Sequence, residues 1–399
     1  MTRQRVIAQS IIYALLVTFV VNAHGIARLT VWPSVKAGQL NFLLAPLLLG
    51  VMASVVVLQV GSKRFRIKEH HASLLGLTIL LSTVLFVFGI GLLPYGKGVS
   101  LPQLVRDLGF LWMITVTAIA FNIKIESRSI DLSLFTQVLF FLSVIILPIV
   151  GAFTFTSPLE GRYGGFLLTS SMMGNAVFLL LLIAYEAKVR RAWLLVFTAV
   201  SGVIIFSTGT RVAFVLYVGF VLYYFGYQWV RWGRKGFRAV TLALVGLVAI
   251  FVVDGIIAYL TQVSQEGTYR VISVSDVEAG SIATRLLWLQ QLWSEMPQSL
   301  FLGGFGAGQA ELFIGVIPHF DVLRYWFDYS IIYVIIFAIL IIKISRIRKQ
   351  SNIMPKRRRI YSLFVYVSVF AMTTHNIFQD VAITLLAVLM LIPGVRKIS

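Results

Sequence analysis

Twelve runs of mostly apolar residues, each close to the length of a membrane-spanning helix, divide the sequence. A helix needs about 20 such residues to cross the hydrocarbon core of a bilayer. Because irregular backbone cannot face lipid, the runs predict an all-α polytopic membrane protein with about twelve transmembrane helices. The predicted spans are Val6–Asn22, Leu40–Val60, Ala72–Leu93, Leu104–Phe121, Leu132–Phe155, Leu167–Tyr185, Ala192–Thr208, Val212–Val230, Ala239–Tyr259, Tyr329–Ile344, Ile360–Thr374 and Val381–Pro393.

The composition excludes an ordinary soluble domain. Hydrophobic residues make up 59% of the chain and charged residues 12%, whereas soluble domains carry about 25% charged residues. Residues 1–399 are therefore predicted to form a single integral membrane domain. The chain has no cysteine, which excludes disulfides, thiolate metal sites and a cysteine nucleophile.

The charges separate by side of the membrane. With a cytoplasmic N-terminus, the inner segments carry 25 of the 34 basic residues and 4 of the 15 acidic ones, for a net charge of +21. The outer segments are left with a net charge of −2. This positive-inside pattern predicts a multi-pass membrane protein with both termini in the cytoplasm. It explains the overall charge of +19 without a nucleic-acid partner.

One outer connection is much longer than the others. Residues 260–328 form a predicted outer loop of about 70 residues before the tenth span, and loops of this length usually carry function. Apolar residues recur at helical spacing between Ala283 and Trp293. The loop is therefore expected to be partly helical and to lie against the outer membrane surface.

Cations on the outer face have no role in orienting the chain and are the first candidates for a site. Arg211 follows Ser207-Thr-Gly-Thr in a tight turn between two spans, and Arg285 begins the amphipathic stretch. His319 lies just before the tenth span, and His375 lies just before the last. Residues alone leave open whether these side chains act chemically or only sit at the interface.

The loop also contains a glycine-rich run and several carboxylates. Gly303-Gly-Phe-Gly-Ala-Gly308 lacks the Lys-Ser/Thr of a phosphate-binding loop, so a tight turn or a close helix approach is favoured over a nucleotide site. The loop carboxylates can in principle gather round a divalent ion, but solvated side chains are the favoured interpretation, and no metal or cofactor is predicted. These carboxylates are Asp276, Glu278, Asp321 and Asp328.

The order of these motifs resembles the superfamily of O-antigen ligases and O-antigen polymerases, bacterial envelope glycosyltransferases. The likeness is strongest from about Ala192 to Ile344. It rests on Thr208-Gly-Thr-Arg211 opening a span, Arg285 opening an amphipathic helix, the run Leu-Gly-Gly-Phe-Gly-Ala-Gly308, and Pro-His319 before the next span. Arg162-Tyr-Gly-Gly also looks like a family feature. Members often have His-Asn at the last motif, whereas Phe320 follows His319 here.

The resemblance implies an activity and roles for residues. In the superfamily a glycan moves from undecaprenyl diphosphate to a sugar hydroxyl at the periplasmic face of the inner membrane, without a metal and with inversion at the anomeric carbon. The resemblance therefore implies that this chain lies in the inner membrane and that its loop at residues 260–328 is periplasmic. Arg211 and Arg285 are implied to contact the diphosphate, and His319 is implied to be catalytic at the acceptor hydroxyl. The further accessory candidates are Arg162, Arg324, Asp321 and His375.

Two choices remain open at this stage. The resemblance favours a polymerase, which extends a lipid-linked repeat unit, over a ligase, which attaches the chain to lipid A–core. Ligases of the superfamily are expected to carry a longer segment between the two motifs, whereas only 34 positions separate Arg285 from His319 here. A lipid-linked oligosaccharide flippase or transporter is the alternative of another class. Transport sites place ionisable groups or broken helices near the middle of the membrane, and the predicted span centres carry almost no charge.

Overall fold

The computed structural model describes ten stretches of the chain, and every regular element in them is helical. The described residues are 69–91, 98–126, 132–142, 170–208, 210–232, 282–299, 302–315, 320–346, 356–372 and 381–391. Their elements are α3 (Glu69–Gly89), α4 (Leu101–Glu126), α5 (Leu132–Phe140), α7 (Ser170–Glu186), α8 (Arg191–Thr208), α9 (Arg211–Trp232), α12 (Ile282–Glu295), the 3-10 helix η2 (Met296–Gln298), α13 (Gln309–Ile314), α14 (Asp321–Arg346), α15 (Lys356–Met372) and α16 (Val381–Leu391).

The all-helical prediction is confirmed for the described residues. Four of their helices, α3, α4, α8 and α14, are long and apolar enough to cross a membrane. Together with the composition, they indicate a membrane protein. The predicted spans Val6–Asn22, Leu40–Val60 and Ala239–Tyr259 lie outside the described residues, so the total of twelve stays a prediction.

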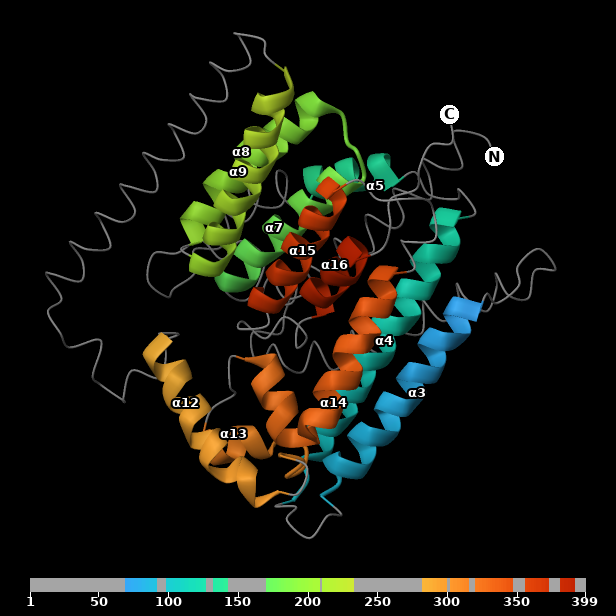
Figure 1. The fold of residues 1–399 in the computed structure, drawn as a ribbon, viewed down its shortest axis with the longest axis vertical. Coiled ribbons are helices and arrows are strands. Elements are labelled where there is room, and N and C mark those ends of the chain that lie inside the picture. The colour runs from blue at the N-terminus through green and yellow to red at the C-terminus, as the bar shows by residue number, and fades with distance from the viewer. Residues whose placement is uncertain are drawn as a thin grey trace, which may run out of the picture.

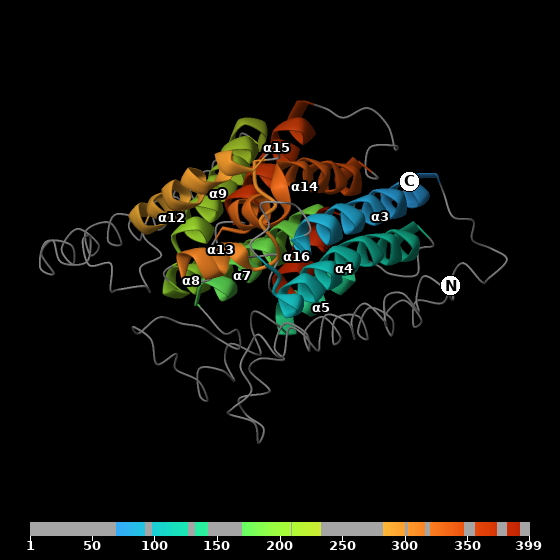
Figure 2. The ribbon, with the colours of Figure 1, turned by 90° about the horizontal axis from the view of Figure 1, so that it is seen from below.

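The helices pack as two groups joined by α16 (Figures 1 and 2). In one group α7 contacts α5, α8 and α9, and α15 packs on α9. In the other, α3 lies against α4 and α14. Helix α16 touches α7 on one side and α4 on the other. A continuous apolar core runs through both groups, with Phe110, Phe178 and Phe220 among its fully buried side chains.

Helix α14 is broken at Ser330, whose φ of 79° and ψ of 165° are not helical. Residues twelve apart in a straight helix stand about 18 Å apart, yet the rings of Tyr325 and Phe337 are 5.9 Å apart. Residues 321–329 (the first arm) therefore fold back on residues 331–346 (the second arm), as Figure 1 shows. The Ser330 side chain accepts the N–H of Ile332 at 3.3 Å and so caps the second arm, as serine commonly does at helix starts. The predicted tenth span, from Tyr329, begins one residue before this break.

The described part of the predicted long loop is folded. Helix α12 ends at Glu295, and η2 begins at Met296. Pro297 is the second residue of η2 and cannot continue an α-helix. A small apolar core then joins α12, η2, the glycine-rich loop, α13 and the first arm, and we call residues 282–329 the α12–α14 module. The core residues are Leu292, Met296, Phe305, Ala310, Leu323 and Phe327. The helical content predicted between Ala283 and Trp293 is thus confirmed by α12.

Candidate functional site

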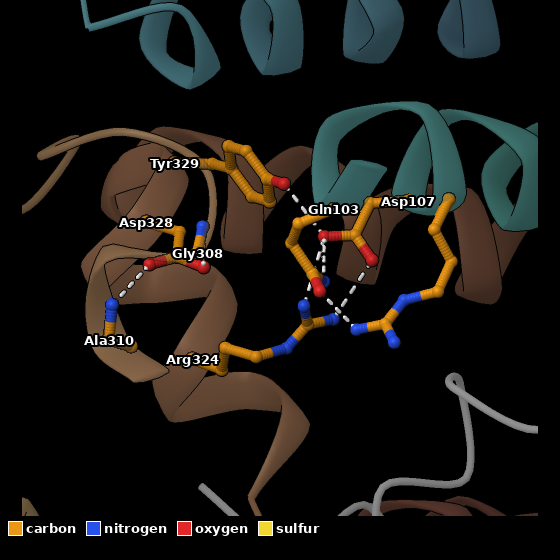
Figure 3. Close-up of polar contacts among 8 residues, drawn as sticks. Gln103, Asp107, Gly308, Ala310, Arg324, Asp328 and Tyr329 are labelled. Atoms are coloured by element: carbon orange, nitrogen blue, oxygen red, sulfur yellow. Dashed lines mark hydrogen bonds and ion pairs between the residues drawn. The ribbon is translucent and has the colours of Figure 1, made fainter. Parts of the chain in front are cut away.

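Asp107 is the centre of a buried polar network that joins the bundle to the α12–α14 module (Figure 3). It lies in the second turn of α4 and is 2% exposed. Arg324 of the first arm donates to both carboxylate oxygens, at 3.0 and 3.1 Å. The Tyr329 hydroxyl donates at 2.7 Å and the Gln103 amide at 2.9 Å. The carboxylate thus binds two side chains of the first arm and one of its own helix.

The geometry of the pair is that of a strong ion pair. Two parallel N–H···O bonds from a guanidinium are the most directional way to hold a carboxylate. Arg324 is 1% exposed and its guanidinium also lies 4.4 Å from the centroid of the Tyr325 ring. Removing one member of such a buried pair costs about 3–5 kcal/mol, because the other charge is left uncompensated.

The network extends along α4 toward the helix start. Gln103 accepts a hydrogen bond from Arg106 on its side-chain oxygen, while its amide nitrogen donates to Asp107. Residues three and four apart share a helix face, so Gln103 contacts both Arg106 and Asp107, and the three form a polar strip in the first two turns of α4. This strip lies where α4 begins, about 9 Å along a helix of about 39 Å.

The glycine-rich loop holds the first arm from the other side. The break at Ser330 frees carbonyl groups that a continuous helix would use. The Phe327 carbonyl accepts the N–H groups of Gly304 and Phe305, at 2.8 and 3.2 Å, and the Asp328 carbonyl accepts that of Gly306 at 3.2 Å. The backbone donors of this loop are therefore already used within the fold, which argues against phosphate binding there.

Close approach explains the glycines themselves. A Cβ atom at Gly303 would overlap the Trp326 carbonyl oxygen, one at Gly304 would overlap the Phe88 ring, and one at Gly306 would overlap the Gly98 carbonyl oxygen. All three have positive φ. The predicted close approach is confirmed, and it ties the loop to α14, to α3 and to the segment just before α4.

The turn that carries Arg211 is fixed by its two threonines. The Thr208 hydroxyl donates to the Ile205 carbonyl at 2.7 Å and lies 3.0 Å from the Thr210 hydroxyl. Both threonine side chains press on α7, where a Cβ atom at Gly174 would come within 2.8 Å of them. Arg211 is the first residue of α9, and its side chain lies outside the described part.

The predicted site residues fall into three groups. Arg211 and Arg285 have described backbones, at the start of α9 and in the first turn of α12, and neither side chain is described. His319, Arg162 and His375 lie outside the described residues. Arg324 and Asp321 are described and buried. The structure places the helix of Arg285 and the arm that follows His319 around one apolar core.

Two predictions about carboxylates were wrong. Asp321 and Asp328 were expected as solvated loop residues, but both are 0% exposed and belong to the first arm. Asp321 lies in the first turn of α14, where the helix dipole favours a negative charge. Among the described residues no group of three or more His, Asp or Glu side chains is placed to hold a metal ion.

Asp107 was missed by the sequence analysis. The signal was present, because Arg106 and Asp107 fall inside the predicted span Leu104–Phe121, and an ionisable residue within a span usually has a partner. The partner is 217 positions away, and nothing local in the sequence indicates it.

Comparison of the chain with protein-family models, with curated protein sequences and with solved structures finds no match. Function must therefore be argued from the residues and the fold.

Proposed function

We propose that the chain is a membrane glycosyltransferase that moves a glycan from undecaprenyl diphosphate to a sugar hydroxyl at the periplasmic face of the inner membrane. The supporting observation is the shared core of the α12–α14 module. It brings the helix that carries Arg285 together with the arm that begins directly after His319 and Phe320. In the proposed reaction Arg285 binds the donor diphosphate and His319 acts on the acceptor hydroxyl, so both must lie near one pair of substrates. A core shared by α12 and the first arm is consistent with that requirement.

The third element of the proposed site is at the same end of the bundle. In Figure 1, α9 runs upward, so its first turn lies at the lower end, on the side of α12. Figure 2 also draws α12 on the same side of the molecule as α8 and α9. The start of α9 thus lies at the end of that helix which is nearer to α12 in Figure 1.

The proposed chemistry fits these side chains. The acceptor oxygen forms a bond to the anomeric carbon as the bond from that carbon to the diphosphate breaks, with inversion. His319 takes the proton of the acceptor hydroxyl, which is worth about 100- to 10,000-fold in rate. Arg211 and Arg285 stabilise the charge that develops on the diphosphate, since guanidinium binds phosphate oxygens bidentately and stays ionised. The arginines thereby supply the positive charge without a metal.

A polymerase is the preferred form of this activity, and a ligase is the alternative. The preference rests on the compactness of the segment between Arg285 and His319, which is 34 positions long. Within it, the described residues are taken up by α12, η2, the glycine-rich loop and α13. We expect a ligase to need a larger segment to hold lipid A–core.

A transporter is the alternative of another class, and the break in α14 is the observation that favours it, because broken helices often hold substrate in transporters. Such sites lie near the middle of the membrane, whereas Asp107 lies in the second turn of α4. Arg324 and Asp107 also satisfy each other's charge. The network therefore suits an interfacial scaffold better than a transport path.

The decisive experiment removes the gene and examines the surface polysaccharide on a gel. Loss of a polymerase leaves single repeats on lipid A–core, and loss of a ligase leaves unattached lipid-linked long chains. A surface glycan of normal amount and length would refute both forms of the proposal.

A further inference from the structure

We infer that Asp107 is a positioning residue that sets the first arm of α14, and through it the segment of His319, relative to the membrane bundle. This inference rests on the proposed function. It assigns a role to a residue of α4, which belongs to a predicted span and not to the periplasmic loop. The carrying observation is that Asp107 accepts three hydrogen bonds from the arm, two from Arg324 and one from Tyr329, and a fourth from Gln103 of its own helix.

The arm cannot be oriented by its own backbone. A continuous helix would fix residues 321–329 relative to residues 331–346, but the break at Ser330 removes that constraint. The glycine-rich loop holds the end of the arm near the break, through the carbonyls of Phe327 and Asp328. The end that follows His319 lies farther along the arm, and Arg324 is the side chain that connects that part to α4.

The bond between Arg324 and Asp107 is well suited to this task. A bidentate guanidinium–carboxylate pair fixes orientation as well as distance. Tyr329 donates to the same carboxylate one residue before the break, so the arm is held at two points, five residues apart. Two points define the direction of a short helix, whereas one would allow it to pivot.

Loss of the Asp107 carboxylate is expected to lower kcat while leaving the KM of the donor almost unchanged. In the proposed mechanism Arg211 and Arg285 bind the diphosphate, while the arm places the base. Asp107→Asn should therefore lower kcat by about 100-fold, the usual effect of misplacing a reacting group by about 1 Å, with little change in the KM of the lipid-diphosphate donor. Thr115→Val, which removes the buried hydrogen bond between Thr115 of α4 and Thr78 of α3, is the matched control and should retain turnover.

A second variant separates positioning from direct contact with substrate. Asp107→Asn combined with Arg324→Gln replaces the ion pair by two amides that can hydrogen-bond to each other without a buried charge. If the pair only positions the arm, the double variant should recover most of the turnover lost in Asp107→Asn. A double variant that stays inactive while its arm is correctly placed would overturn the inference, because it would show that the charges act on the substrate.

The position of the arm can be measured without any glycan transfer. The chain has no cysteine, so spin labels can be attached at introduced cysteines in the full chain in lipid nanodiscs. Val105 on α4 and Leu312 on α13 are 46% and 70% exposed, and α13 is bound to the arm through Asp328. The distance between labels at Val105→Cys and Leu312→Cys should shift or broaden in Asp107→Asn and return in the double variant.

The outcomes distinguish the inference from the proposed function. An unchanged label distance in Asp107→Asn, or an equal loss of turnover in Thr115→Val, overturns the positioning role. Expected distances in a wild-type chain that transfers no glycan would refute the proposed function and leave the coupling of the arm to α4 in place. Should Asp107→Asn not fold, Tyr329→Phe removes one donor, keeps the ring and should lower kcat less, again with the KM of the donor almost unchanged.

Discussion

The carboxylate of Asp328 accepts the backbone N–H of Ala310 at 2.8 Å and so caps α13 from a helix 18 positions further along the chain. Its other oxygen accepts the N–H of Gly308 at 3.1 Å. The first N–H groups of a helix have no partner within it, and no side-chain cap comes from Gly308 itself. The short helix α13 therefore depends on the arm that packs against it.

Asp328→Asn should destabilise the α12–α14 module by about 1–3 kcal/mol, the cost of a buried hydrogen bond lost to an unsatisfied group. The asparagine can place its oxygen against one N–H group, and its amide then faces the other donor. Limited proteolysis of the purified protein should show faster cleavage within residues 302–315. Glu311→Gln, which neutralises a carboxylate in α13 without touching this cap, is the control, and equal cleavage of the two variants would contradict the prediction.

Gly306→Ala should lower the stability of the folded chain by about 1–3 kcal/mol or more, because it combines a backbone overlap with a positive φ. The added Cβ atom would meet the Gly98 carbonyl oxygen, which is backbone and has little room to move, at a φ of 119°. Gly109→Ala in α4 meets no atom within 4 Å and should be neutral or stabilising by up to about 1 kcal/mol. Thermal unfolding in detergent compares the two, and a similar midpoint for both would contradict the role of the loop.

Gly174→Ala should weaken donor binding about tenfold if Arg211 holds the diphosphate, since a shift worth about 1.4 kcal/mol is tenfold in affinity. The new methyl group would press on Thr208 and Thr210, and the turn before Arg211 would have to move. Titration with the lipid-diphosphate donor measures the effect. Gly76→Ala, in α3 with open space around its Cβ position, should bind donor as the wild type does, and unaltered affinity in Gly174→Ala would argue against Arg211.

His319→Ala and Arg285→Ala should affect different properties of the protein, turnover in the first and donor binding in the second. If His319 is the proposed general base, the first should lower kcat by about 100- to 10,000-fold while the protein still binds donor. The second should weaken donor binding. Single-turnover transfer and donor titration of the two purified variants separate these effects, and near-normal product from His319→Ala would refute its catalytic role.

Several elements of the fold are directly predictable from the sequence. The helix Arg191–Thr208 matches the predicted span Ala192–Thr208 within one residue, and α16 begins at the predicted Val381. Long apolar runs bounded by charged or glycine-containing turns have strong signals at both ends. The tenth span was predicted to begin at Tyr329, one residue before Ser330. Ser330 breaks α14 and caps the second arm, so the second arm begins close to the predicted position.

The interior of the candidate site was harder to predict. A sequence shows that Asp328 and Asp321 are acidic and lie in a polar segment, but their burial depends on partners elsewhere in the chain. Asp328 is buried because Gly308 and Ala310 need an acceptor, and Asp107 is paired with a residue 217 positions away. The glycine-rich run was interpreted correctly because positive φ and close approach are properties of glycine itself.

The way the α12–α14 module is attached has a practical consequence. Its described links to the bundle include the glycine-rich loop against Phe88 and Gly98, and the arm against Asp107. The module can therefore be regarded as a unit that is exchangeable provided its contacts with Phe88, Gly98 and Asp107 are kept. We expect chimeras that keep these three contact positions to fold with a related module of different length or acceptor preference. The membrane helices would not need to be redesigned.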